Sequence, residues 1–178
     1  MGFSISWVAF RNLAKAEVLK RRGFRDSGAE DEANEAPFSL AEIPTGWTIL
    51  FSNDFDYGAP EHLIELSSSA VVLSCQAEEH IMFSSAYCYA NGREAWGVWH
   101  DSQRGRYDLS TRGTLPPEFA PIKMRLIAKQ ADNDRGDGNV DYIFDVPVEL
   151  AAELTGYRHD RWQFDWGRPD FTVLERGG

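Results

Sequence analysis

The sequence predicts an α+β fold, a single domain in which helices pack on one face of a mostly antiparallel sheet. Two aromatic-rich runs flank Asn91-Gly92, and this dipeptide accepts the positive φ angles of a type I′ turn, so residues 81–101 are expected to form a β-hairpin. The expected order of elements, β-α-β-α-β-β-β-α-β-α, mixes helices with this antiparallel unit. With 178 residues, 43% of them hydrophobic, the chain is long enough for one domain (1–178) with a substantial core.

Apolar runs and turn residues place the elements of the first half. We expect strand, helix, strand, helix and strand in turn, at residues 3–10, 15–22, 47–52, 60–67 and 70–77. Gly23 suits the left-handed position that ends a helix, and Pro60 suits the first position of the next helix. The polar, acidic segment 25–36 is predicted to be a mobile connection.

The second half is interpreted in the same way. After the hairpin we expect a loop, a helix, a strand and a helix, at residues 102–115, 118–130, 140–146 and 147–156. Residues 78–80, ahead of the hairpin, form either a turn or a bulge in one long bent strand. The last segment, 157–178, is too rich in tryptophan and phenylalanine for a disordered tail, so we expect it to pack on the body.

The charge pattern limits the classes of partner. A net charge of −10 argues against nucleic-acid binding, because contacts to phosphate require cations. Basic residues gather in residues 1–25, whereas residues 26–35 hold five acids and no base. We expect either that the acidic segment folds back on the basic helix or that both are solvated. The alternative is a basic face that binds an anion or a partner.

The sequence favours a cytoplasmic protein. Its N-terminal apolar stretch is short and lacks the basic flank of a signal peptide, and no run approaches the roughly 18 apolar residues of a membrane helix. The two cysteines, Cys75 and Cys88, lie in apolar runs, which indicates small buried side chains in a reducing compartment.

The hairpin supplies the candidate binding residues. A regular two-residue turn at Asn91-Gly92 would place Tyr87 opposite Trp96. One face would then be aromatic with polar handles, suited to a ligand or a protein partner, and it would carry Tyr87, Glu94, Trp96 and His100. The alternative is that this stripe is core, and a one-residue bulge would exchange the faces.

Histidines and carboxylates supply weaker catalytic candidates. A metal or hydrolytic site could gather His80, His100 and His159 with Glu79. Strand alternation places His80 and His100 on opposite faces unless the chain turns at residues 78–79. There is no HExxH, no cysteine-rich spacing, no nucleophile elbow and no phosphate-cradling glycine pattern, so we expect no metal and no cofactor. Structural histidines are the alternative.

Two further carboxylates fall in the predicted strand 140–146. Asp141 and Asp145 would share one strand face, where a pair of carboxylates could serve acid–base chemistry. We favour a different role for Asp145, because it lies just ahead of the helix expected from Pro147 and could cap its free N–H groups.

Several motifs resemble a family of uncharacterised bacterial proteins, a domain of unknown function: SISWVAFR, PTGW, EEHIMFSSA, the W-x-V-x-H-D end of the hairpin, VDYIFDVPVELA and LTGYRHD. The resemblance covers most of the chain and implies no activity. In composition, the acidic, tryptophan-rich domain also resembles immunity proteins of bacterial toxin systems. We therefore expect a non-enzymatic binding protein, immunity-like or regulatory, with a protein partner or as a homodimer. The alternative is a small His/carboxylate metal-dependent hydrolase.

Overall fold

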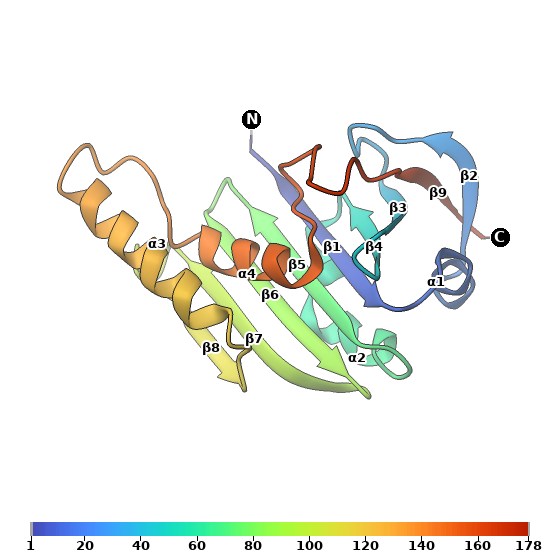
Figure 1. Cartoon of the computed structure of the whole chain (residues 1–178), viewed down its shortest axis with the longest axis horizontal. Helices are drawn as coiled ribbons and strands as arrows, with labels where there is room; N and C mark the ends of the chain where they lie inside the picture. Colours follow the sequence, from blue (N-terminus) through green and yellow to red (C-terminus); the bar gives the residue numbers. More distant parts are fainter. Residues whose placement is uncertain (1, 178) are drawn as a thin grey trace.

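The structure, a computed structural model, describes residues 2–177. Within that range nine strands form one antiparallel sheet in the spatial order β2-β9-β3-β4-β1-β5-β6-β7-β8 (Figure 1). The strands are β1 (Ser4–Arg11), β2 (Phe24–Glu30), β3 (Phe38–Ile43), β4 (Trp47–Ser52), β5 (Val72–Glu78), β6 (Phe83–Ala90), β7 (Arg93–Asp101), β8 (Ser110–Gly113) and β9 (Thr172–Arg176). The helices are α1 (Lys15–Arg22), η1 (Phe55–Gly58, a 3-10 helix), α2 (Pro60–Leu66), α3 (Phe119–Asp134) and α4 (Asp145–Thr155).

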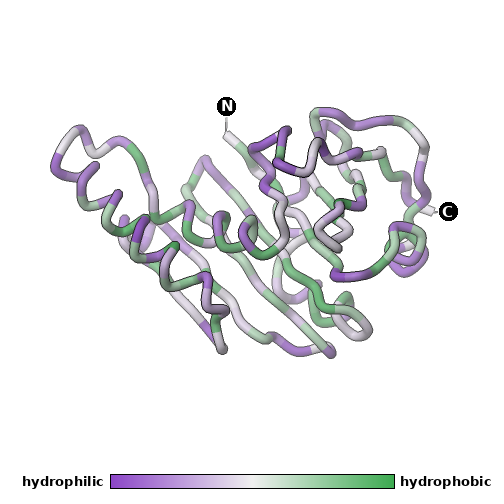
Figure 2. The backbone as a smooth tube through the Cα atoms, viewed as in Figure 1, coloured by the Kyte–Doolittle hydropathy of each residue, from purple (hydrophilic) through white to green (hydrophobic). Residues whose placement is uncertain are grey.

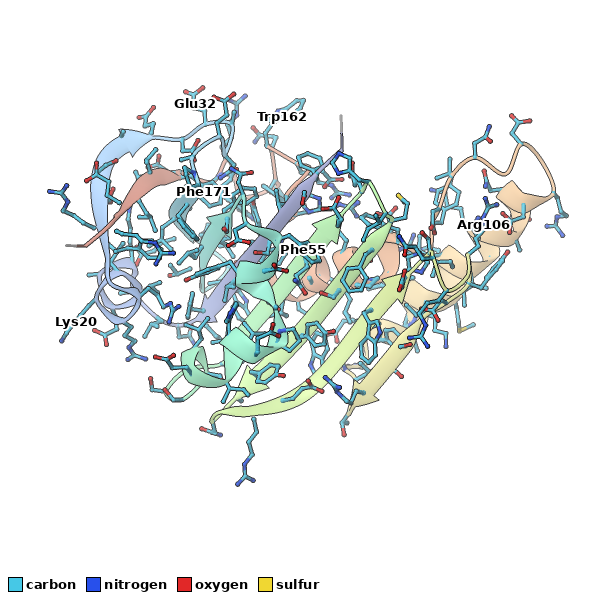
Figure 3. All side chains as sticks on the ribbon, turned by 180° about the vertical axis from the view of Figure 1, so that it is seen from behind. Lys20, Glu32, Phe55, Arg106, Trp162 and Phe171 are labelled. Atoms are coloured by element: carbon cyan, nitrogen blue, oxygen red, sulfur yellow. The ribbon has the colours of Figure 1, made fainter. Side chains whose placement is uncertain are left out.

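Helices cover both faces of the sheet, so the predicted one-sided arrangement is wrong. On one face, Trp7 of β1 packs in a core that includes residues of α3 and α4. On the other, Val8 packs in a second core with residues of α1, η1 and α2. Figure 1 shows α3 and α4 in front of the sheet, and Figure 3, seen from behind, shows η1 with its labelled Phe55 on the opposite side.

The central strands explain why two layers form. Nearly every residue of β1, β4 and β5 is buried, whichever face it points to. Their sequences are continuous runs of apolar and small residues rather than an alternation of apolar and polar residues. Such runs indicate a sheet covered on both sides, because each face then requires its own apolar layer. The hydropathy map agrees, with hydrophilic residues concentrated in peripheral parts such as α1 and the α3–α4 loop (Figure 2).

Several predicted elements are confirmed together with their caps. Helix α1 ends at Gly23, which has a φ of 66° and donates its N–H to Leu19. Pro60 begins α2. The hairpin turn has a φ of 52° at Asn91 and 70° at Gly92, as the two central residues of a type I′ turn require. Local backbone chemistry decides these positions, so they can be identified without tertiary contacts.

Two predicted segments are wrong. Residues 140–146 form no strand; a turn there leads into α4, which begins at Asp145. Residues 25–36 are not an irregular connection throughout, because β2 occupies residues 25–30 and pairs with β9. The acidic segment does fold back on the basic helix, where Lys15 Nζ lies 2.6 Å from the Asp26 carboxylate. Pairing with a strand almost 150 residues away leaves no local pattern in the sequence.

The C-terminal segment, predicted at 157–178, packs along the α3–α4 face of the sheet and then enters it as β9. Tyr157 is 1% exposed and meets Trp7 edge to face, with ring centroids 5.2 Å apart. Phe171 is also buried in this core. The segment therefore positions the residues that directly follow α4, which contribute to the site described next.

Candidate functional site

A β-bulge in the hairpin changes the predicted faces. Cys88 lies opposite Trp96, whereas Tyr89 lies opposite Glu94, so Ala95 is an extra residue in β7. Tyr87 consequently faces Gly97 instead of Trp96, and the predicted register beyond the bulge is wrong. Since side chains alternate along a strand, one extra residue moves the rest of β7 to the opposite face.

The candidate binding residues therefore do not form one surface. Trp96 is 6% exposed and belongs to the core beneath α3 and α4, on the same side as the buried His100. Tyr87, 7% exposed, lies in the core on the opposite side of the sheet. On that side Glu94 accepts a hydrogen bond from the Tyr89 hydroxyl at 2.9 Å. Neither Tyr87 nor Trp96 is available to a partner as an exposed patch.

Gly97 provides a test of this register. A Cβ atom added at Gly97 would lie 2.6 Å from the Tyr87 ring, which stacks on Trp99 at a centroid distance of 6.1 Å. We expect Gly97→Ala to lower the free energy of unfolding by about 1–3 kcal/mol, because the ring must move within a packed core. Gly136→Ala, whose nearest added contact is 3.5 Å away in a loop, should change it by less than about 0.5 kcal/mol. Urea denaturation of both variants measures the difference.

His100 is fully buried and both of its ring nitrogens have partners. Nδ1 lies 2.6 Å from the backbone carbonyl of Asp108, and Nε2 lies 3.0 Å from Oδ2 of Asp141. A carbonyl only accepts, so Nδ1 carries a proton. Burial opposes charge on the ring, but the Asp141 carboxylate and the Asp108 carbonyl outweigh it and raise the pKa of His100. When His100 is protonated, it forms a largely buried ion pair with Asp141, whose side chain is 13% exposed.

Asp141 also organises the entry to α4. Its Oδ1 accepts hydrogen bonds from the backbone N–H groups of Ile143 and Phe144, at 3.1 and 3.2 Å. Burial raises the pKa of Asp141, yet the hydrogen bond from His100 and these N–H groups lower it overall. The capping role predicted for Asp145 thus belongs largely to Asp141, four residues earlier, whereas Asp145 occupies the first turn of the helix.

An open cavity of about 540 Å³ lies beside this ion pair, at the N-terminal end of α4. Its wall contains four carboxylates drawn from separate places: the β5–β6 turn, the loop before α4, the start of α4 and the segment after α4. They are Glu79, Asp141, Asp145 and Asp160. Three catalytic candidates from the sequence, Glu79, His80 and His159, line this cavity, whereas His100 lies behind Asp141 and is not part of the wall.

Arg158 holds two of the four carboxylates in place. Its Nη2 lies 2.8 Å from Asp145 and its Nε lies 2.6 Å from Asp160. Burial disfavours the charge of Arg158, but the hydrogen bond to Asp160 and the two carboxylates raise its pKa further. Burial likewise opposes ionisation of Asp160, but Arg158 lowers its pKa overall. Sequence reasoning missed Arg158, although it directly precedes the candidate His159 and the acidic Asp160 in the motif LTGYRHD.

His159 contributes a neutral ring to the same wall. Its Nδ1 atom is buried and has no hydrogen-bond partner among the described residues. Its ring meets Phe3 edge to face at a centroid distance of 5.0 Å. Burial lowers the pKa of His159 to about 4, because the charged imidazolium would lose its hydration. His159 is therefore uncharged at neutral pH.

His80 and Glu79 lie in the turn that joins β5 to β6, so the turn predicted as one alternative at 78–80 is present. The exposed His80 ring lies 2.6 Å from a Glu78 carboxylate oxygen through Nδ1. Oε2 of Glu79 accepts a hydrogen bond from the backbone N–H of Phe3 at 3.1 Å. This turn places His80 at the cavity. It does not bring His80 next to His100, which lies outside the cavity wall.

Within residues 2–177, no three histidine, cysteine or acidic side chains converge in a way that could hold a metal ion. Over the same residues, no helix is long and apolar enough to cross a membrane.

No protein-family model, no curated protein and no solved structure matches this chain. The resemblance to a bacterial family of unknown function therefore stays a prediction. The function has to be argued from the site itself.

Proposed function

We propose that this chain is a cytoplasmic, non-enzymatic binding protein that receives a lysine or arginine side chain of a protein partner. The observation that carries the proposal is the gathering of four carboxylates around one open cavity with a single arginine, Arg158, in its wall. Even with the buried His100 counted as a second positive charge, the cluster retains an excess of negative charge. A cation that enters compensates this excess.

Much of the cavity wall is held in its binding geometry before a ligand arrives. Asp141 is fixed by His100 and by two backbone N–H groups, and Arg158 fixes Asp145 and Asp160. Side chains that are already ordered lose little rotamer entropy when a ligand binds. The low pKa of Asp141 and of Asp160 keeps both carboxylates ionised at neutral pH.

Exposed apolar residues near the carboxylates support a protein as the source of the cation. Ile81 and Val140 are 46% and 45% exposed, and they adjoin or line the cavity. Trp162, two residues after Asp160, is 73% exposed and projects outward in Figure 3. Aromatic and aliphatic residues beside a polar cavity are characteristic of interfaces, where they supply the buried contact area.

The hydrolase alternative receives partial support, because Glu79, His80 and His159 share the cavity. The lining residues that the structure describes include no serine, threonine, cysteine, tyrosine or lysine, so they offer no side-chain nucleophile of these types. His159 lacks the carboxylate hydrogen bond that orients a catalytic base; His80 has such a partner in Glu78, but its side chain is 63% exposed. The arrangement therefore favours binding over hydrolysis.

Titration with N-acetylarginine methylamide, followed by ¹H–¹⁵N NMR, tests the proposal. We expect shifts concentrated in residues 79–82 and 141–145, and weaker shifts with the uncharged citrulline analogue. Glu79→Gln should weaken binding by about two- to fivefold, the effect of one partly exposed charge pair.

Glu65→Gln on α2 is the matched control, since it removes the same charge on the other face of the sheet. It should leave the affinity unchanged. Equal binding of arginine and citrulline analogues, or equal weakening by Glu65→Gln and Glu79→Gln, would contradict a cation site here.

A further inference from the structure

A second cavity, of about 420 Å³, lies on the α3–α4 face at the C-terminal end of α4, away from the acidic cavity. It is bounded by the ends of β1 and β6, the starts of β4 and β5, the middle of β7 and the loop before α3. Its lining residues are Arg11, Asn12, Thr45, Gly46, Trp47, Val71, Leu73, Cys88, Trp96, Pro116 and Leu154. The volume falls in the roughly 300–1,000 Å³ range of small-molecule sites.

Sheet register explains the apolar wall. Leu73 lies opposite Cys88, and Cys88 lies opposite Trp96, so the three side chains form one row across β5, β6 and β7. Leu73 and Trp96 are 1% and 6% exposed, and Trp47, at the start of β4, is 9% exposed. Two indole rings and aliphatic side chains therefore offer a rigid apolar surface to a ligand body.

None of the polar side chains at this cavity carries a negative charge. Arg11 is exposed, and within the described residues its guanidinium makes no ion pair and no hydrogen bond. The Asn12 side-chain amide likewise has no partner in that part of the chain. No lining residue is acidic, in contrast to the four carboxylates at the other end of α4.

We propose that this second cavity binds a small organic monocarboxylate, with the carboxylate on Arg11 and an apolar body against Trp47, Leu73 and Trp96. Arginine matches a carboxylate with two parallel N–H donors, which makes the pairing specific for an anion of this shape. In a chain with a net charge of −10, a cavity that has an unpaired arginine and no acid in its wall is selective for an anion. The inference is independent of the function proposed for the acidic cavity.

Isothermal titration calorimetry with three ligands of one body and different head groups tests this site. The ligands are 3-phenylpropanoate, 3-phenylpropan-1-ol and 3-phenylpropylamine. We expect the carboxylate to bind at least about tenfold more tightly than the alcohol, and the amine to bind most weakly, as a charge-assisted hydrogen bond implies. Absence of carboxylate binding up to about 10 mM, or equal affinity for the three head groups, would overturn the proposal.

Variants of Arg11 identify the anion partner. Arg11→Gln should remove the preference for the carboxylate, and Arg11→Glu should transfer it to the amine. Arg104→Gln, an exposed arginine in the β7–β8 loop, is the matched control and should bind as the unchanged protein does. Because Arg11 is exposed, both substitutions should leave the melting temperature nearly unchanged. A carboxylate preference that survives Arg11→Glu overturns the assignment.

Cys88 provides a second readout at the site. Its half-buried thiol lines the cavity, whereas Cys75 is fully buried. Alkylation by iodoacetamide, followed by mass spectrometry, should therefore modify Cys88 first, and saturating 3-phenylpropanoate should slow that reaction at least about threefold. Phenylpropanoate that binds by calorimetry without protecting Cys88 would place the ligand elsewhere and refute this cavity.

Discussion

His100→Ala is expected to lower the free energy of unfolding by about 3–5 kcal/mol, the largest effect of any substitution considered for this protein. The imidazole is fully buried, and its loss leaves the Asp141 carboxylate without its cation and a void beside β7. Removing one partner of a largely buried ion pair is costly because the Asp141 carboxylate, with a side chain only 13% exposed, keeps little contact with water. Urea denaturation at pH 6 measures the change.

A double variant separates the charge effect from the void. Asn at position 141 can still accept the two N–H groups at the start of α4 but carries no charge. We therefore expect His100→Ala combined with Asp141→Asn to be more stable than His100→Ala alone. Two results would show that no ion pair exists there. One is a decrease in unfolding free energy for the double variant that equals the sum of the decreases for the two single variants, and the other is a decrease below about 1 kcal/mol for His100→Ala. His62→Ala, an exposed histidine on α2, should change stability by less than about 0.5 kcal/mol.

The pH dependence of this pair follows from the two pKa shifts. The pKa of His100 is raised above its ordinary 6.5 in the folded protein. Its contribution to the free energy of unfolding is therefore complete below pH 6.5 and disappears as pH rises through the folded-state pKa. The pKa of Asp141 is lowered from its ordinary 3.8. Its contribution to the free energy of unfolding is therefore present above pH 3.8 and disappears as pH falls through the folded-state pKa. The loss caused by His100→Ala should therefore be greatest between about pH 4 and 6.5.

His159→Phe is expected to make the protein less sensitive to acid. The pKa of His159 falls from 6.5 to about 4 on folding, so between these values the unfolded state binds more protons and stability drops as pH falls. The drop approaches about 3 kcal/mol at pH 4, because each pKa unit corresponds to about 1.4 kcal/mol. Phenylalanine does not titrate and keeps the edge-to-face contact with Phe3.

Urea denaturation between pH 4 and 7 measures how steeply the free energy of unfolding of each variant changes with pH. The difference in unfolding free energy between His159→Phe and the unchanged protein should grow as pH falls from 6.5 to 4. Phe3→Ala is the companion variant: it opens one side of the His159 ring to water, so it should reduce the acid sensitivity without removing the imidazole. Parallel pH profiles for the unchanged protein and His159→Phe would contradict a buried, neutral His159.

The candidate site could be predicted only in part from the sequence. Of the four residues predicted to share a site, Glu79, His80 and His159 line one cavity, whereas His100 lies behind Asp141 and outside its wall. The binding set built on Tyr87 and Trp96 is not a surface, because one inserted residue in β7 sends these rings to opposite faces. A bulge leaves the turn motif unchanged, so the sequence contains no local sign of it.

What the sequence by itself determined are the features that short-range chemistry controls. The ends of α1 and α2, the type I′ turn and the buried central strands follow from glycine, proline, asparagine and apolar runs that act within a few residues. Tertiary structure alone decided that β2 pairs with β9, which helices lie on which face of the sheet, and that Arg158 joins Asp145 and Asp160 at one cavity. These arrangements depend on contacts between residues far apart in the chain, where the energy lies in packing and charge pairing rather than in local backbone preference.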